Sequence, residues 1–136
     1  MVWSAGNIEP TGTGSSTITN AAGGVFDIQG DLLLRDPSNN DSGVHTLTFA
    51  NQAGGELRRS SGTGTTQLGG LVDGNDVLAF NLQNDGTFNV SAGTVTMGLA
   101  GVTSSNGGSF LVGAGALLDY VSGTHALGNM TAKEGT

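Results

Sequence analysis

The stretch of residues 20–28, which reads NAAGGVFDI, decides the fold because its pattern returns twice at a fixed interval. Three glycines mark the copies, each 31 residues after the one before: Gly24, Gly55 and Gly86. A large apolar residue follows each glycine by two positions: Phe26, Leu57 and Phe88. Such a period, built from short apolar pairs between Gly and Asn, is typical of solenoids, in which each coil buries its apolar face on its neighbours.

A second column of apolar residues lies upstream of the glycines. Its members are Ile18, Phe49 and Phe80 at the same interval, and Phe110 continues it after 30 residues. Side chains of a strand alternate between its two faces, so apolar residues two apart point to the same side. We therefore expect an all-β chain with three short strands per coil, and we expect these four side chains to be successive rungs of one ladder.

The repeat predicts a single β-solenoid domain over residues 1–136. Residues 1–14 are expected to form a partial first turn, residues 15–44, 45–76, 77–107 and 108–129 four coils, and residues 130–136 a tail. In the last coil the second strand is offset by one residue, which indicates a bulge at Leu117 or Leu118. Stacked Asn or Thr side chains at the corners are expected to hydrogen-bond to their copies in the next coil.

Three longer and more variable inserts separate the coils, at residues 35–44, 69–76 and 98–108. Insertions in a solenoid lie on one side, so these loops are expected to form a ridge along a single edge. That edge is the predicted recognition surface. No helix is expected, because glycine interrupts every candidate segment and nothing recurs at the helical spacing.

The composition excludes several classes of protein. A formal charge of −7, with 11 acidic and 4 basic residues, argues against nucleic-acid binding, which needs clustered Lys and Arg. The chain has no cysteine, so disulfides and thiolate metal sites are excluded. No apolar run approaches the roughly 20 residues of a spanning helix. The opening Met1-Val2-Trp3-Ser4 has no signal-peptide pattern, so either a signal has been removed or this is an excised segment, which we favour.

Two longer phrases carry a resemblance to a known class of protein. Residues 84–97 read NDGTFNVSAGTVTM, and residues 113–125 read GAGALLDYVSGTH. They resemble the Gly/Asn/Thr-rich passenger repeats of large bacterial surface and secreted proteins, of the adhesin and autotransporter kind, and the resemblance covers nearly the whole chain. It implies a right-handed parallel β-helix and a secreted or cell-surface location. Activity does not follow from it, because such folds serve as stalk, scaffold, adhesin and filament alike.

Oxygen-rich side chains in the inserts are the candidate metal ligands. Calcium binds six to eight hard oxygen ligands, and the inserts contribute Asp36, Asp41, Asp73 and Asp76. Neither loop has the spacing of an EF-hand or of the nonapeptide repeat of calcium-binding β-rolls. Solvated turn residues are therefore the main interpretation, with no metal or other cofactor, and a calcium site is the alternative.

Arg58 and Arg59 are the only adjacent basic residues in the chain. Arg59 aligns with the inward positions Ile28 and Val90, where a buried guanidinium would be costly without a partner. We therefore expect both side chains to be solvated at the edge of the coil, with burial of Arg59 as the alternative. Arg58 shares a column with Asp27, which predicts a surface ion pair between coils.

The remaining candidates have structural interpretations. His45 and His125 lie in different coils without metal-ligand spacing, so both are expected to be structural. Trp3 is expected to cap the first turn, and stacking on a sugar ring is its alternative role.

These observations predict a non-catalytic structural or interaction module without catalytic residues, namely a stalk, an adhesin or a filament subunit that associates end to end through its exposed ends. The alternative is a carbohydrate-binding module that uses the insert edge. The candidate partners besides a second copy are a glycan and a protein receptor. A polysaccharide-degrading enzyme is a third hypothesis, in which Asp73 or Asp76 would act. It needs converging carboxylates that the strand pattern does not provide.

Overall fold

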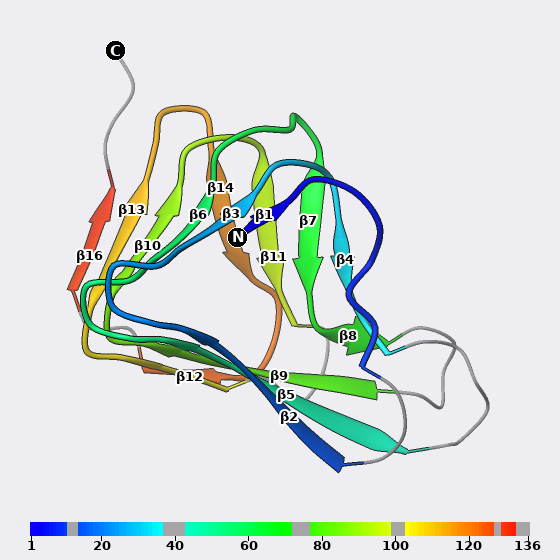
Figure 1. Cartoon of the computed structure of the whole chain (residues 1–136). Coiled ribbons are helices and arrows are strands. Elements are labelled where there is room, and N and C mark those ends of the chain that lie inside the picture. Colours follow the sequence, from blue (N-terminus) through cyan, green and yellow to red (C-terminus); the bar gives the residue numbers. More distant parts are fainter. Residues whose placement is uncertain (11–13, 37–42, 72–76, 99–102, 127–128, 133–136) are drawn as a thin grey trace.

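The computed structural model describes residues 1–10, 14–36, 43–71, 77–98, 103–126 and 129–132. All regular structure in these ranges is β-strand, arranged as three sheets that surround a common interior (Figure 1). The described ranges contain no helix long and apolar enough to cross a membrane.

Each sheet collects strands from distant parts of the chain. Sheet A contains β1 (Val2–Trp3), β3 (Val25–Ile28), β6 (Glu56–Arg59), β10 (Thr87–Val90), β13 (Ser109–Val112) and β16 (Asn129–Ala132). Sheet B contains β4 (Leu33–Leu34), β7 (Thr65–Leu68), β11 (Thr94–Met97) and β14 (Leu117–Tyr120). Sheet C contains β2 (Gly14–Asn20), β5 (Val44–Asn51), β9 (Val77–Asn84), β12 (Thr103–Asn106) and β15 (Thr124–His125), and β8 (Gly70–Leu71) pairs antiparallel with β9.

The chain visits the three sheets in the order C, A, B again and again. We call the successive sets layers one to four: β2, β3, β4; then β5, β6, β7; then β9, β10, β11; then β12, β13, β14. Strands of adjacent layers pair in parallel in all three sheets. The prediction of an all-β chain with short strands in parallel sheets is confirmed, and the arrangement is consistent with a parallel β-helix.

The N-terminal segment adds part of a further turn. β1 pairs with β3 in sheet A, and Ile8 forms a bridge to Leu34 in sheet B. Trp3 is buried there, packs edge-on against Phe26 at a centroid distance of 6.4 Å, and donates its indole N–H to the Gly6 carbonyl at 2.9 Å. The expected capping role of Trp3 is therefore confirmed.

The strand register confirms one predicted column and corrects the other. Phe26, Leu57 and Phe88 are paired neighbours in sheet A, as the 31-residue interval predicts. In sheet C, Ile18 pairs with Phe49, as expected. The expected positions of Phe80 and Phe110 are wrong: Phe80 pairs with Leu47, and Phe110 lies in sheet A beside Phe88.

A change in turn length explains the position of Phe80. Five residues run from Asn51 to Gly55, but only three run from Asn84 to Gly86. Sheet C therefore slips by two residues while the glycines keep their interval, and Leu82 takes the place beside Phe49. The shorter turn packs very tightly, because a Cβ added at Gly86 would collide with the Gly55 carbonyl oxygen.

A short sequence interval explains the position of Phe110. It follows Phe88 by 22 residues rather than 31, and its strand is the second strand of layer four. The first strand is β12, inside the segment that was expected to be an insert. Leu117 and Leu118 then pair with Thr94 and Val95 in unbroken register, so the expected bulge is not needed.

Apolar side chains from all three sheets fill the interior. Their burial supplies the main favourable term for folding. Aromatic rings meet across the layers, with centroid distances of 5.0 Å for Phe26 and Phe49 and 5.6 Å for Phe88 and Phe110. The largest fully buried apolar side chains are Phe80, Phe88, Phe110, Ile28, Leu47, Leu57, Leu78, Leu82, Met97, Val90 and Val95.

Candidate functional site

A buried arginine occupies the corner between sheets A and B. Arg59 is paired with Ile28 on one side and Val90 on the other, so its side chain points into the interior, where it is 0% exposed. The expectation that Arg59 is solvated is therefore wrong. The cost of burying a guanidinium is offset only if its donors are satisfied.

Hydrogen bonds from Arg59 reach three layers. Its Nε–H donates to the Ala92 carbonyl at 2.8 Å in layer three, and Nη1 donates to the Gly30 carbonyl at 2.6 Å in layer one. Nη1 also donates to the Thr66 hydroxyl, and Nη2 donates to the Gly64 carbonyl at 3.1 Å, both in layer two. The guanidinium therefore ties three layers together with donors that point in fixed directions.

The counter-ion of Arg59 lies at the surface. Asp31 Oδ1 is 2.7 Å from Arg59 Nη2, while the Asp31 side chain is 50% exposed. The carboxylate thus keeps part of its hydration while it neutralises a buried charge. Gly62 and Gly93 make room for this arrangement, because both have positive φ and a Cβ at either would crowd Arg59 Nη2.

Asparagine side chains form a second interlayer connection. Asn20, Asn51 and Asn84 end β2, β5 and β9, and all three are buried. Asn20 Nδ2 donates to Asn51 Oδ1 at 2.8 Å, and Asn51 Nδ2 donates to Asn84 Oδ1 at 2.7 Å. Asn51 Nδ2 also donates to the Thr87 carbonyl at 3.0 Å. The predicted stacking of Asn columns is confirmed for these residues, which we call the asparagine ladder.

The predicted pair of Asp27 and Arg58 is present. Arg58 Nη2 lies 2.8 Å from Asp27 Oδ2, and Gln29 Nε2 donates to the same oxygen at 2.9 Å. The Asp27 side chain is buried, whereas that of Arg58 is 39% exposed. The pair is therefore half-buried rather than the expected surface pair. The Arg58 guanidinium is the main cause that lowers the pKa of Asp27 to about 2.

This depressed pKa predicts a specific acid sensitivity. A carboxyl that is more acidic in the folded state stabilises the fold above its unfolded pKa, and this contribution is lost as the pH falls through about 2. Asp27→Asn should therefore flatten the fall of the melting temperature between about pH 4 and pH 2. Melting followed by circular dichroism at several pH values measures this. The matched control is Asp119→Asn at an exposed strand position, and an equal flattening in that variant would contradict the assignment.

Only one of the four candidate calcium ligands lies among the described residues. Asp36 is buried, at 1% exposure, and Asp41, Asp73 and Asp76 lie outside the described residues. Within the described ranges, no group of three or more His, Asp or Glu side chains is placed to share a metal ion. A calcium site therefore stays a prediction.

The two histidines contact different partners. His45 is buried, and its Nε2 is 3.0 Å from the Ser16 hydroxyl across β2 and β5. The His125 ring packs on Tyr120 at a centroid distance of 4.3 Å, and its Nε2 is 2.8 Å from the Ser122 carbonyl oxygen. Burial raises the pKa of the Tyr120 hydroxyl.

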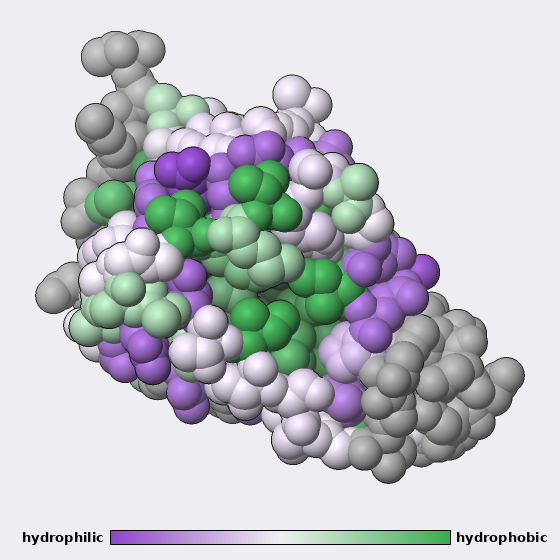
Figure 2. All heavy atoms as spheres, viewed as in Figure 1, coloured by the Kyte–Doolittle hydropathy of each residue, from purple (hydrophilic) through white to green (hydrophobic). Residues whose placement is uncertain are grey.

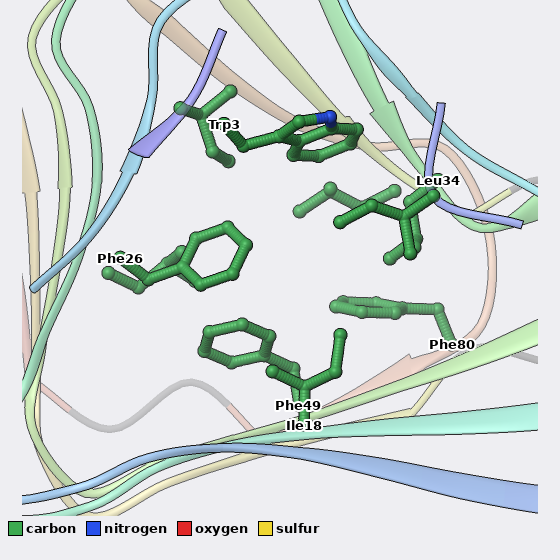
Figure 3. A pocket seen from close by; sticks show the side chains of 10 residues that line it. Trp3, Ile18, Phe26, Leu34, Phe49 and Phe80 are labelled. Carbon is green, nitrogen blue, oxygen red and sulfur yellow. The ribbon is translucent and has the colours of Figure 1, made fainter. Parts of the chain in front are cut away.

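Two hollows differ in their lining. One lies at the end of the core nearest the N-terminus, where Trp3, Ile18, Phe26, Leu34, Phe49 and Phe80 point toward one another (Figure 3). The space between them is about 10 Å³, which is room for about one water molecule and for no organic ligand. The other is an open polar hollow of about 150 Å³ where the turns change length, lined by Ala50, Asn51, Gln52, Gln83 and Asp85.

Comparison of the chain with protein-family models, with curated proteins and with solved structures gives no match.

Proposed function

We propose that this chain is a non-catalytic structural and interaction module of a bacterial extracellular or cell-surface protein, folded as a right-handed parallel β-helix of about four coils. In this proposal layers one to four are the coils, and β15 with β16 is part of a further turn at the C-terminal end. The fourth coil then begins with β12, before the expected boundary at residue 108, and β16 lies where a tail was expected. Right-handed winding is proposed because parallel crossover connections are right-handed in about 98% of cases. The extracellular location rests on the resemblance to bacterial surface repeats, and the absence of cysteine is compatible with it.

The observation that carries the proposal is that buried polar side chains form hydrogen bonds between layers. Arg59, Asn20 and Asn51 donate hydrogen bonds to neighbouring layers, and Asp27 accepts one from Arg58 of layer two. Such bonds hold coils in register along the axis of the stack, as a stalk, an adhesin or a filament subunit requires. Repeat proteins gain stability mainly from such nearest-neighbour contacts.

Charged side chains support a structural role as well. Besides the pairs of Arg59 with Asp31 and of Arg58 with Asp27, Arg35 Nε lies 2.9 Å from Glu9 Oε1 and connects the N-terminal segment to layer one. Each of these guanidiniums binds a carboxylate of another layer or turn. Hydrolysis or β-elimination of polysaccharides instead needs acids or bases that converge on a substrate.

Hydrogen exchange combined with an activity screen tests the proposal. A stack held by its interlayer contacts should protect the amides of layers two and three most strongly, with protection falling toward both ends. We expect no turnover on a panel of neutral and anionic polysaccharides. Turnover that persists after rigorous purification would overturn the non-catalytic function, and uniform rapid exchange across β5, β6, β9 and β10 would overturn the structural one.

A further inference from the structure

The outer side of β2 is an open strand edge. The N-terminal turn covers sheet A through β1 and sheet B through Ile8, but β2 ends the strand order of sheet C. Within the described part of the chain, no strand pairs with β2 on that side. β2 pairs over its whole length with β5 on the other side, so its conformation is already fixed for pairing.

The register shows which backbone groups face outward. The Gln52 N–H donates to the Asn20 carbonyl at 3.0 Å, so the backbone groups of Asn20 face β5. Backbone direction alternates along a strand, so Ser16 and Ile18 also face β5, while Ser15, Thr17 and Thr19 present their N–H and C=O groups to the open side. These three residues are exposed, as an unpaired edge requires.

The asparagine ladder has a direction, and its open end lies at the same edge. Asn51 accepts a hydrogen bond from layer one and donates one to layer three. Asn20 donates through Nδ2 to Asn51 Oδ1 and to the carbonyls of Gly24 and Glu56, yet none of the described residues donates to its Oδ1. The residue as a whole is 8% exposed. An amide donor placed one strand above Asn20 would complete the ladder.

The edge lacks the usual protection against strand pairing. Natural edge strands are commonly blocked by Lys, Pro, bulges or inward charges, and β2, with the sequence GSSTITN, has none of these residues. Apolar surface borders it, and Figure 2 shows this surface at the centre of the end face, framed by hydrophilic residues. Ile18, Phe26 and Trp3 contribute to the apolar hollow there.

We propose that the outer edge of β2 binds one extended polypeptide strand in parallel, and that this strand comes from a coil of the same type. This inference rests on the proposed interaction function and names the partner. An apolar residue of the partner would lie over Ile18, and an asparagine over Asn20. β5, which pairs with the other edge of β2, already has such residues, because Phe49 lies beside Ile18 and Asn51 lies beside Asn20.

A synthetic peptide with the sequence of residues 43–56, GVHTLTFANQAGGE, is the probe. Trp3 is the single tryptophan and lies at this end of the core, so its fluorescence reports binding. We expect saturable binding to the whole chain and at least a tenfold loss for the protein variant Thr17→Pro. This change removes an outward N–H but no bond to β5, so the circular dichroism spectrum should be unchanged.

N-methylated peptides test the same edge without any protein variant. In the native-like register, the N–H of peptide residue Phe49 faces Thr17, whereas that of Thr48 faces away. Methylation at Phe49 should abolish binding, and methylation at Thr48 should leave it within about threefold. Absence of saturable binding at millimolar peptide, or equal effects of the two methyl groups, would overturn the proposal. Peptide binding is measured independently of the hydrogen exchange and the polysaccharide screen that test the proposed function. The inference can therefore fail while the proposed function stands, and the two failures are distinguishable.

Discussion

Arg59→Ala is expected to lower the free energy of unfolding by about 3–5 kcal/mol, because it removes a fully buried guanidinium and several hydrogen bonds from a charged donor, each worth about 1.5–3 kcal/mol. The reason lies in what the substitution leaves behind. The carbonyls of Gly30, Gly64 and Ala92 lose their donor in a half-buried corner, and Asp31 loses its cation. A buried acceptor without a donor costs about 1–3 kcal/mol by itself.

Urea denaturation followed by circular dichroism measures this loss. The matched control is Arg35→Ala, which breaks a pair whose side chains are 36% and 32% exposed and should cost at most about 1 kcal/mol. Arg59→Lys keeps the charge but cannot donate in five directions, so it should fall between the two. Equal stability of the Arg59→Ala and Arg35→Ala variants would show that the corner does not depend on its guanidinium.

Arg59 also shows where sequence reasoning reached its limit. The alternation of side chains placed position 59 inside, but the cost of burying an unpaired charge argued for a solvated side chain. The partners that offset this cost are mostly backbone carbonyls from three layers. Their convergence depends on how the corners stack, and no local pattern of residues reveals it.

The strand register could be predicted from the sequence where the repeat interval is constant. Gly24, Gly55 and Gly86 give the correct register in sheet A because the chain between them keeps its length. The next interval is shorter, and β12 reads Thr-Ser-Ser-Asn, without a large apolar residue to mark it as a strand. Extending the 31-residue period therefore placed Phe110 in sheet C, although it lies in sheet A. The candidate calcium loops remain predictions for a different reason, because most of them lie outside the described residues.

Asn51→Asp should destabilise the fold by about 3–5 kcal/mol at neutral pH, because it leaves a buried charge without a cation. The substitution keeps the shape of the side chain and replaces its N–H donors by an oxygen. Asn51 is 1% exposed, and its Nδ2 donates to Asn84 Oδ1 and the Thr87 carbonyl, so both acceptors would then face a carboxylate. Only the bond from Asn20 would survive.

The pH dependence of the stability of this variant separates the effect of the new negative charge from the effect of the changed side-chain shape. Burial among acceptors raises the pKa of the new carboxyl above its unfolded value, so the penalty is largest at neutral pH and shrinks as the pH falls below the raised pKa. The matched control is Gln52→Glu, the same amide-to-carboxyl change at the next residue, which is exposed and should shift stability by less than about 0.5 kcal/mol. Urea denaturation of both variants at pH 7 and pH 5 measures the difference. If the two variants lost equal stability at pH 7, the asparagine ladder would not hold layers one to three together, because a buried ladder and an exposed turn cannot respond alike to the same charge.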